Sequence, residues 1–398
     1  MMDETQALVP RLRFPEFREA GEWVASSLED ICHMQSGKFI AAAEISSDFE
    51  DGMFPCFGGN GLRGYTKTYN QSGRYSLIGR QGALCGNVNL VNGDFYATEH
   101  ALVTTPKSGI STAWLFYNLT LLNLNRFATG QAQPGLSVEV LDKVPCAVPR
   151  DEKEQQKIAD CLSSLDALIA AQADKIDALK THKKGLMQQL FPREGETIPC
   201  LRFPEFRDAG EWEEKTLEQV AKYENGKAHE QDIVEQGKYI VANSKFISTS
   251  GEVKKFTNTA NLLAEKDDIL MVLSDVPNGR AIAKCFYVDK ANTYAVNQRI
   301  CRLTAKEADS IVLFYLLDRN DYFLAFDDGV KQTNLKKDDV LSCPVVLPKD
   351  RDEQKEIADC LSSLDALIAA QTEKLEALKI HKIGLMQQLF PSSEAVGV

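Results

Sequence analysis

Hydrophobic residues recur at every third or fourth position through two long segments of the chain that contain no proline. In residues 151–190 the apolar side chains alternate in steps of four and three, and residues 350–389 repeat the same spacing. This spacing places them along one side of an α-helix, as in the seam of a coiled coil. Pro149 and Pro192 bound the first segment, where a helix cannot easily extend. The pattern therefore predicts two helices, each roughly 60 Å long.

The seam positions correspond in the two segments. They are Ile158, Leu162, Leu165, Ile169, Ile176, Leu179, Leu186 and Leu190 in the first, and Ile357, Leu361, Leu364, Ile368, Leu375, Leu378, Leu385 and Leu389 in the second. One helix cannot bury such a stripe alone, so we expect the two helices to bury each other in an intramolecular coiled coil. Gln172 and Lys183 interrupt the seam, and both recur in the second segment. They either lie near a gap and reach water, or fix the register of the pair at some cost in stability.

The similarity of the two segments extends to a duplication of the whole chain. Residues 148–192 align with residues 347–391 at an offset of 199, with 12 differences in 45 positions. A shorter repeat precedes each half: LRFPEFREAGEW at 12–23 returns as LRFPEFRDAGEW at 201–212. Two copies of nearly 200 residues indicate a tandem pair of similar domains and no solenoid.

Between the repeats lie two blocks of different sequence, which we expect to be mixed α/β domains. Strand-like runs such as YSLIG at 75–79, ALVTT at 101–105 and DILMVLS at 268–274 alternate with turns rich in Gly and Asn. Weak correspondences, such as SLEDICHMQSGK at 27–38 with TLEQVAKYENGK at 216–227, predict one shared fold. The chain then divides into a lead-in (1–23), block 1 (24–149), a helix (150–191), a second lead-in (192–212), block 2 (213–348), a helix (349–390) and a tail (391–398). The predicted fold class is α+β: two mixed α/β domains of similar fold, joined and spaced by two long helices.

Composition and charge narrow the class of protein. The chain has no apolar leader and no apolar run of membrane-spanning length, and its ten cysteines show neither a C-x-x-C pair nor zinc spacing. We therefore expect a reduced, cytoplasmic protein without a metal site. The net charge of −12 argues against a protein that holds nucleic acid alone. Residues 52–135, however, carry six basic residues against two acids, a local charge of +4, which allows a basic face there.

Polar side chains suited to base edges and phosphates gather in the loops of both blocks. Arg reads guanine, Asn and Gln read adenine, and Lys binds phosphate as a point charge. Each of these residues taken alone is also ordinary surface or turn chemistry. The candidates are Arg63, Tyr65, Lys67, Arg80, Gln81, Asn87, Asn89, Gln131 and Gln133 in block 1, and Asn243, Lys245, Lys254, Asn278, Arg280, Asn297, Gln298, Arg299, Lys331, Gln332 and Asn334 in block 2.

The sequence shows no catalytic constellation. FGGNG at 57–61 lacks the Lys-Ser/Thr of a phosphate-binding loop and is better interpreted as a turn. There is no cofactor-cradling glycine motif of an amino-methyltransferase. Glu99-His100 has no Ser or Cys partner, and Asn297-Gln298 replaces it in the second copy, so it is interpreted as a structural or contact pair.

Several strings resemble the specificity subunit of Type I restriction-modification systems. They are LRFPEF…GEW at each unit start, LPKDRDEQKEIADCLSSLDALIAAQ and its copy, HKxGLMQQLFP at both helix ends, and FGGNGLRGYT, LIGRQGALCGNV and FYATEHALV in block 1. The resemblance covers essentially the whole chain. It implies two target recognition domains, each reading half of a split DNA site, and two antiparallel helices that set the gap between the halves.

The resemblance also implies that this chain is non-catalytic. Two modification subunits that use S-adenosylmethionine would methylate adenine, and restriction subunits that use ATP and Mg would translocate and cut. Part of the affinity for double-stranded DNA would then come from these partners. Two alternatives come from other classes: a coiled-coil protein–protein adaptor without DNA recognition, and a self-sufficient methyltransferase or nuclease.

Overall fold

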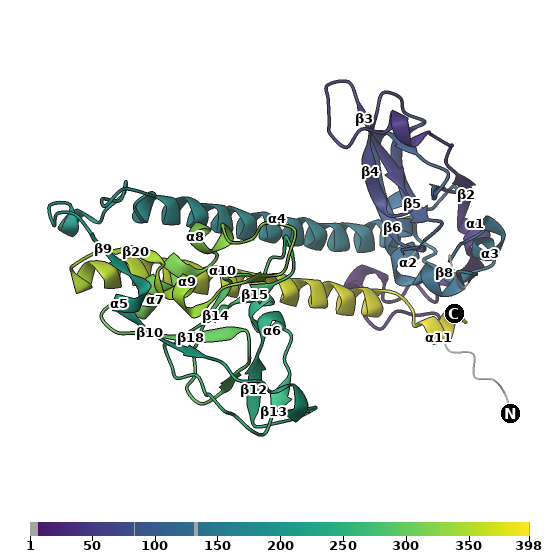
Figure 1. Cartoon of the computed structure of the whole chain (residues 1–398). Coiled ribbons are helices and arrows are strands. Elements are labelled where there is room, and N and C mark those ends of the chain that lie inside the picture. Colours follow the sequence, from purple (N-terminus) through teal and green to yellow (C-terminus); the bar gives the residue numbers. More distant parts are fainter. Residues whose placement is uncertain (1–6, 83, 131–133, 398) are drawn as a thin grey trace. The chain divides into compact units, whose positions relative to one another are not determined.

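The computed structural model describes residues 7–82, 84–130 and 134–397, apart from the side chains of residues 230, 393 and 394. The chain divides into two units (Figure 1). Unit 1 comprises Met1–Asp174 and Thr372–Val398, and unit 2 comprises Lys175–Gln371. Each unit therefore contains one variable block and half of each long helix.

The two long helices form where the heptad pattern predicts them. Helix α4 spans Glu152–Leu190 and helix α10 spans Arg351–Leu389, 39 residues each; they are the long teal helix and the long green-to-yellow helix of Figure 1. All sixteen apolar seam positions are buried or partly buried, and none is exposed. The first half of α4 belongs to unit 1 and its second half to unit 2, whereas α10 contributes in the reverse order.

Within unit 1 the two helix halves run antiparallel. Ile158 and Leu162 of α4 share a core with Met386 and Leu389 of α10. Asp166, further along α4, meets Lys382, which is earlier on α10. Residue numbers therefore increase along one helix in the direction in which they decrease along the other.

Unit 2 repeats this arrangement with the other two halves. Leu190 at the end of α4 shares a core with Ile357 and Leu361 near the start of α10, and Lys183 meets Asp365. The predicted fold class, two mixed α/β domains with long antiparallel helices in a coiled coil, is confirmed.

Block 1 is built on a six-stranded sheet with the strand order β2-β7-β5-β6-β3-β4. All neighbours are antiparallel except β3 and β6, which are parallel. The buried residues of β5 and β7, including Leu77, Ile78 and Leu102, form its centre. The strands are β2 (Cys32–Ser36), β3 (Phe54–Gly58), β4 (Gly61–Thr66), β5 (Gln71–Gly79), β6 (Val88–Ala97) and β7 (Ala101–Pro106).

Short elements connect this sheet to the helices. Strands β1 (Val24–Ser27) and β8 (Pro145–Val148) pair antiparallel just before α4 begins. Helix α2 buries Trp114, Tyr117 and Leu119, and Trp114 stacks on Phe390 after the end of α10. The remaining elements are α1 (Leu28–Ile31), α2 (Thr112–Leu121), α3 (Val138–Asp142), α11 (Ser393–Val396) and the 3-10 helices η1 (Pro15–Phe17), η2 (Ala42–Glu44) and η3 (Leu124–Phe127).

Block 2 contains two four-stranded sheets, in the orders β10-β18-β14-β16 and β11-β13-β12-β17. Two short pairs, β9 with β20 and β15 with β19, complete it. Its strands are β9 (Glu213–Thr216), β10 (Ala221–Asn225), β11 (Ile233–Val234), β12 (Tyr239–Ala242), β13 (Phe256–Thr257), β14 (Ile269–Val272), β15 (Ser274–Asp275), β16 (Cys285–Tyr287), β17 (Tyr294–Val296), β18 (Ile300–Ala305), β19 (Thr333–Asn334) and β20 (Pro344–Leu347). Its helices are α5 (Leu217–Val220), α6 (Ser244–Ser248), α7 (Ser310–Leu317), α8 (Asp321–Leu324), α9 (Lys337–Leu341), η4 (Pro204–Phe206) and η5 (Glu230–Asp232).

Matched elements show that the two blocks share a fold. The strand–helix–strand β1-α1-β2 corresponds to β9-α5-β10, and each short helix begins with a capping box, Ser27 with Asp30 and Thr216 with Gln219. In both blocks a short parallel pair, β3 with β6 or β12 with β17, lies beside the antiparallel strands. The weak correspondences between the two sequences therefore mark the common framework.

Candidate nucleic-acid interface

Three segments of block 1 meet at one end of its sheet: the residues after β5, the turn between β6 and β7, and the segment up to Leu136. The Arg80 amide donates to the His100 carbonyl (2.8 Å), and the Leu136 amide donates to the Arg80 carbonyl (2.9 Å). Two glycines allow this close packing: a Cβ on Gly79 would lie 2.0 Å from the Gly59 oxygen, and one on Gly59 would lie 3.1 Å from the His100 oxygen. FGGNG, as predicted, forms a turn, between β3 and β4.

Block 2 builds the same junction from different residues. The Leu273 amide donates to the Arg299 carbonyl (2.8 Å), and the Leu335 amide donates to the Leu273 carbonyl (2.8 Å). Leu273 therefore takes the place of Arg80, and Arg299 takes the place of His100. The predicted replacement of Glu99-His100 by Asn297-Gln298 is thus wrong by one residue. The backbone framework is kept while the side chains at these positions differ: Leu273 is buried and Arg299 is exposed.

The structure distributes the block 1 candidates over β4, the turn after β5 and the start of β6. Tyr65 and Asn89 are half-buried, and the Tyr65 ring packs against Phe49. Arg80 is partly used by the fold, since its Nη1 donates to Ser36 Oγ (2.8 Å) and its Nε to the Leu136 carbonyl. Gln131 and Gln133 lie outside the described residues. The exposed candidates, whose side chains form no hydrogen bond within the described part of the chain, are Arg63, Lys67, Gln81 and Asn87.

In block 2 several candidates are likewise tied into the fold. Asn243 caps α6 by accepting from the Phe246 amide, and buried Asn297 accepts from the His229 amide. Gln332 donates to Ser274 Oγ (2.7 Å). Asn278 donates to the Gly329 carbonyl, Asn334 donates to the Gln332 carbonyl, and Gln298 is exposed. The exposed residues whose side chains make no such bond among the described residues are Lys245, Lys254, Arg280, Arg299 and Lys331.

Glu99 and His100 lie at the junction of block 1. His100 Nε2 lies 3.3 Å from Glu99 Oε1, and Glu99 Oε2 is buried without a hydrogen-bond partner among the described residues. The pair therefore belongs to the β6–β7 turn, as expected for a structural or contact pair.

Each lead-in is anchored to a long helix by a buried ion pair. In unit 1, Arg13 donates from Nε and Nη2 to the two oxygens of Glu154 (2.7 and 2.8 Å), and Trp23 Nε1 donates to the same carboxylate (3.3 Å). Side chains of Arg13 and Glu154 are only 7% and 1% exposed. Arg13 also donates to the Gly21 carbonyl, so one guanidinium holds the lead-in turn and the start of α4 together.

Unit 2 repeats this anchor with Arg202, Glu353 and Trp212. The two Arg202–Glu353 bonds are 2.6 and 2.7 Å, and Trp212 Nε1 donates over 3.1 Å. The bond to the buried Glu353 carboxylate raises the pKa of Arg202, which keeps the guanidinium charged. Each lead-in is thus fastened to the first turns of the long helix that follows its block.

A second matched contact joins each block to the coiled coil. Tyr117 of α2 donates to Asp166 (2.8 Å), and Lys382 of α10 pairs with the same carboxylate (2.5 Å). In unit 2, Tyr315 donates to Asp365 (2.6 Å), with which Lys183 pairs (2.5 Å). Burial raises the pKa of both tyrosines, so each hydroxyl stays a donor.

These contacts account for the two lysines in the seam. Lys183 and Lys382 do not simply extend to water: each crosses to an aspartate of the other helix and lies over a tyrosine ring, at 4.7 and 5.5 Å from its centroid. Gln172 is buried and Gln371 is half-buried. An ion pair at one matched seam position favours the interpretation that the lysines fix register.

Reversing one of these charges should destabilise the helix pair. Lys183→Glu would place two carboxylates at the contact, and we expect the free energy of unfolding to fall by about 2 kcal/mol. Adding Asp365→Lys should restore at least half of the loss, because the ion pair is rebuilt with its ends exchanged. Urea unfolding followed by circular dichroism measures both, with exposed Lys180→Glu as the control. Failure of the second change to restore stability would contradict the register interpretation.

Sequence analysis missed these anchors although they carried a signal. Arg13, Trp23, Glu154, Tyr117 and Asp166 all recur in the second half of the chain. Polar or aromatic identity between two otherwise different halves marks a shared structural contact. Only the fold shows which of these residues touch, because they are up to 141 positions apart in unit 1.

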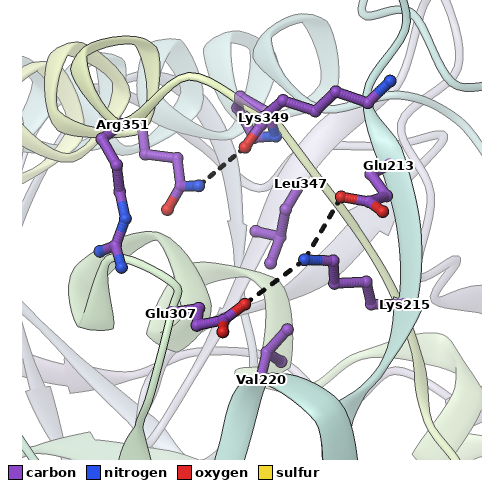
Figure 2. Close-up of a pocket in the computed structure, with 9 residues that line it drawn as sticks. Glu213, Lys215, Val220, Glu307, Leu347, Lys349 and Arg351 are labelled. Carbon is purple, nitrogen blue, oxygen red and sulfur yellow. Dashed lines mark hydrogen bonds and ion pairs between the residues drawn. The ribbon is translucent and has the colours of Figure 1, made fainter.

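Unit 2 also has a small pocket of about 250 Å³ where β9, β20 and the start of α10 meet. Figure 2 shows Lys215 between Glu213 and Glu307, with its Nζ 3.3 and 3.7 Å from their carboxylates. Lys349 and Arg351 line the same pocket. Because the two glutamates offset most of the positive charge of Lys215, Lys349 and Arg351, the pocket has little net charge.

No helix in the described part of the chain is long and apolar enough to cross a membrane. No group of three or more His, Cys, Asp or Glu side chains there is placed to hold a metal ion.

Comparison with known proteins identifies the family. A family model described as the Type I restriction modification DNA specificity domain matches residues 20–181 and again residues 209–379. The two matches cover most of the chain, and each includes one variable block and most of the helix that follows it. The chain belongs to the family of Type I restriction-modification specificity subunits.

Two curated relatives are similar in sequence. The EcoprrI specificity subunit of Escherichia coli is 47% identical over 143 residues, which are 36% of this chain and only 35% of that protein. The MjaVIII specificity subunit of Methanocaldococcus jannaschii is 27% identical over 298 residues, covering 69% of this chain and 68% of the relative.

Solved structures support the fold. A Type I restriction-modification S subunit from M. genitalium matches with a TM-score of 0.65 at 17% identity, over 97% of this chain and all of that one. A chain from a structure of type I R-M complex assembly and conformational transition matches with a TM-score of 0.55 at 14% identity, over 93% and 97% of the two chains.

Proposed function

We propose that this chain is the non-catalytic DNA reader of a Type I restriction-modification complex. Block 1 (24–149) and block 2 (213–348) each read one half of a bipartite site in double-stranded DNA. The paired helices set the spacing of the halves and dock two methyltransferase subunits. Restriction subunits, with ATP and Mg, and S-adenosylmethionine on the methyltransferases would supply the chemistry.

The main support for this proposal is that the two blocks share one backbone framework but differ in their side chains at the junction. Both blocks keep the junction of three segments and both keep the anchors, yet Arg80 and His100 of one become Leu273 and Arg299 of the other. Structural contacts alone do not require this change. Two readers of different base sequences do, because each base pair presents its own pattern of donors and acceptors in the major groove.

The net charge of −12 is consistent with DNA binding that is shared between this chain and its partner subunits. Non-specific affinity for DNA comes mainly from neutralised phosphates. A reader with few excess cations gains that affinity from partner subunits that close around the duplex. The adenine must leave the base stack to be methylated, so the reader positions the duplex and the partner flips the base.

The test is the methylome of a host that carries this chain with its neighbouring methyltransferase subunits. We expect a two-part motif with a fixed gap. Replacing Arg63 and Gln81 by alanine should change the bases read in one half only, and replacing Arg280 and Arg299 should change only the other half. Loss of each bidentate contact should cost about 1–3 kcal/mol of discrimination. Changes in both halves from one set of variants would contradict the proposal.

Two further measurements separate the alternatives. Electrophoretic shift of a duplex with and without the methyltransferase subunits tests the adaptor alternative, which predicts no DNA-dependent complex in either case. Incubation of this chain alone with labelled S-adenosylmethionine and DNA tests the self-sufficient methyltransferase. Transfer of label without partners would overturn the assignment of catalysis to other subunits.

A further inference from the structure

Unit 1 has a second, larger pocket, and none of the candidate base-reading residues is among the described residues that line it. It measures about 430 Å³ and lies between the end of α2, strand β8 and the segment after α10. Asn118, Arg126 and Arg11 contribute polar groups to its lining, and Leu121, Phe390 and Val396 contribute apolar surface. A mixed lining of this kind and a volume above about 300 Å³ are typical of small-molecule sites.

A buried donor at this pocket has no acceptor. The Asn118 side chain is 4% exposed, and its Nδ2 has no hydrogen-bond partner among the described residues. Trp114, one helical turn earlier on α2, is fully buried and stacks on Phe390, and its Nε1 also has no partner within that set. Buried donors without acceptors are rare and costly in native proteins. Among the described residues neither donor has an acceptor, and of the two residues Asn118 is the one that lines the pocket.

Two arginines add positive charge beside these donors. Arg11 and Arg126 are exposed, and neither forms an ion pair within the described part of the chain. Arg126 lies over the Phe127 ring, with its guanidinium carbon 4.8 Å from the centroid. None of the described residues that line the pocket is Asp or Glu. The polar end of the pocket therefore favours a negatively charged acceptor.

The duplicated half of the chain shows that the fold does not need these donors. The pair Phe116-Tyr117 on α2 corresponds to Phe314-Tyr315 on α7, which places Leu316 at the position of Asn118 and Val312 at that of Trp114. Both helices still present the tyrosine that binds the coiled-coil aspartate. The polar pair of unit 1 is thus a feature of one copy and no part of the shared framework.

We propose that this pocket binds a small amphipathic carboxylate. The carboxylate accepts from Asn118 Nδ2 and pairs with Arg126 or Arg11, and the hydrocarbon body packs against Leu121, Phe390 and Val396. The proposal is independent of DNA recognition, since it uses none of the candidate base-reading residues.

The test uses the full-length chain and 3-phenylpropionate as the probe, with 3-phenylpropionamide as the uncharged analogue. Binding is measured by isothermal titration and by saturation-transfer NMR. We expect saturable binding of the acid at one site and at least about tenfold weaker binding of the amide, because charge-assisted hydrogen bonds are about twice as strong as neutral ones. Absence of saturable binding, with the pocket holding water only, overturns the proposal.

Two variants assign the binding to this pocket. Asn118→Leu, which copies Leu316 of unit 2, should weaken binding of the acid by about tenfold or more, and Arg126→Gln by a smaller factor. Arg74→Gln, an exposed arginine of β5 that does not line the pocket, should leave the affinity unchanged. Unchanged affinity in Asn118→Leu contradicts the proposal.

Thermal unfolding distinguishes a loss of ligand binding from a folding defect of the variant. Without ligand, Asn118→Leu should raise Tm by about 2 °C or more, because it removes an unsatisfied buried donor. At the same high concentration of acid, the unaltered chain should gain more stability than the variant, because its Kd for the acid is lower. If the variant melts at a lower temperature than the unaltered chain and still binds the acid, Asn118 has a structural role and the proposal is contradicted.

Discussion

Glu353→Ala should lower the free energy of unfolding of unit 2 by about 3–5 kcal/mol, because it leaves the Arg202 guanidinium buried without its counter-ion. Arg202 is 8% exposed and donates twice to this carboxylate, over 2.6 and 2.7 Å. Trp212 Nε1 loses its acceptor in the same step. The lead-in and the first turns of α10 would then separate.

Trp212 provides a local measurement of this loss. The chain has three tryptophans, and Trp212 is the one that belongs to unit 2. Fluorine NMR of 5-fluorotryptophan-labelled protein during urea unfolding resolves its signal from those of Trp23 and Trp114. Glu205→Ala, an exposed change in η4, should alter stability by less than about 0.5 kcal/mol.

The double variant Arg202→Met/Glu353→Leu tests the cause. Replacing a buried ion pair by well-packed apolar residues is often neutral or stabilising. We therefore expect the double variant to recover most of the stability that Glu353→Ala loses. A double variant as unstable as the single one would show that the Trp212 hydrogen bond or local packing, and not the unpaired charge, dominates.

Lengthening both long helices by one heptad should lengthen the gap between the two halves of the recognised site by about three base pairs, since seven helical residues span roughly 10 Å. Duplicating residues 170–176 in α4 and residues 369–375 in α10 places matched heptads where the chain passes between its two units. A whole heptad keeps the seam in phase, so the antiparallel contacts of each unit are retained. The bases read in each half should not change.

Methylome sequencing of a host that expresses the altered chain with its methyltransferase subunits measures the gap. Two controls separate length from damage. Duplication in α4 alone should abolish methylation, because the helices would then differ in length. A four-residue insertion in both helices moves the seam off its stripe and should lower stability. An unchanged gap in the matched heptad variant would exclude the helices as the spacer.

The anchors and the junction have different parts in the proposed reading of DNA. The Arg–Glu–Trp anchors and the Tyr–Asp–Lys contacts are the same in both units, so they hold each block to the helices whatever DNA sequence it reads. The junction presents different side chains on one backbone. Changes of base specificity should therefore arise at exposed loop residues such as Arg63 or Arg299, with little cost in stability.

The spacing of the hydrophobic residues and the repeated strings were sufficient to predict the architecture. The 4-3 spacing of leucine and isoleucine determined both long helices to within a few residues, because a 39-residue amphipathic stripe admits no other regular structure. The duplicated strings determined that the chain has two similar parts. The strands of block 2 were less evident, since several are only two to four residues long.

The sequence by itself determined the helix pair, the duplication and the family, because each depends on patterns that are local or directly repeated along the chain. Tertiary structure alone decided which polar residues are free to meet a ligand. Asn243, Asn297 and Gln332 have the right chemistry for bases, but the fold uses them as a helix cap and as loop ties. The acceptor that satisfies a side-chain donor lies far away in sequence, as Glu154 does for Arg13, and only folding brings the two together.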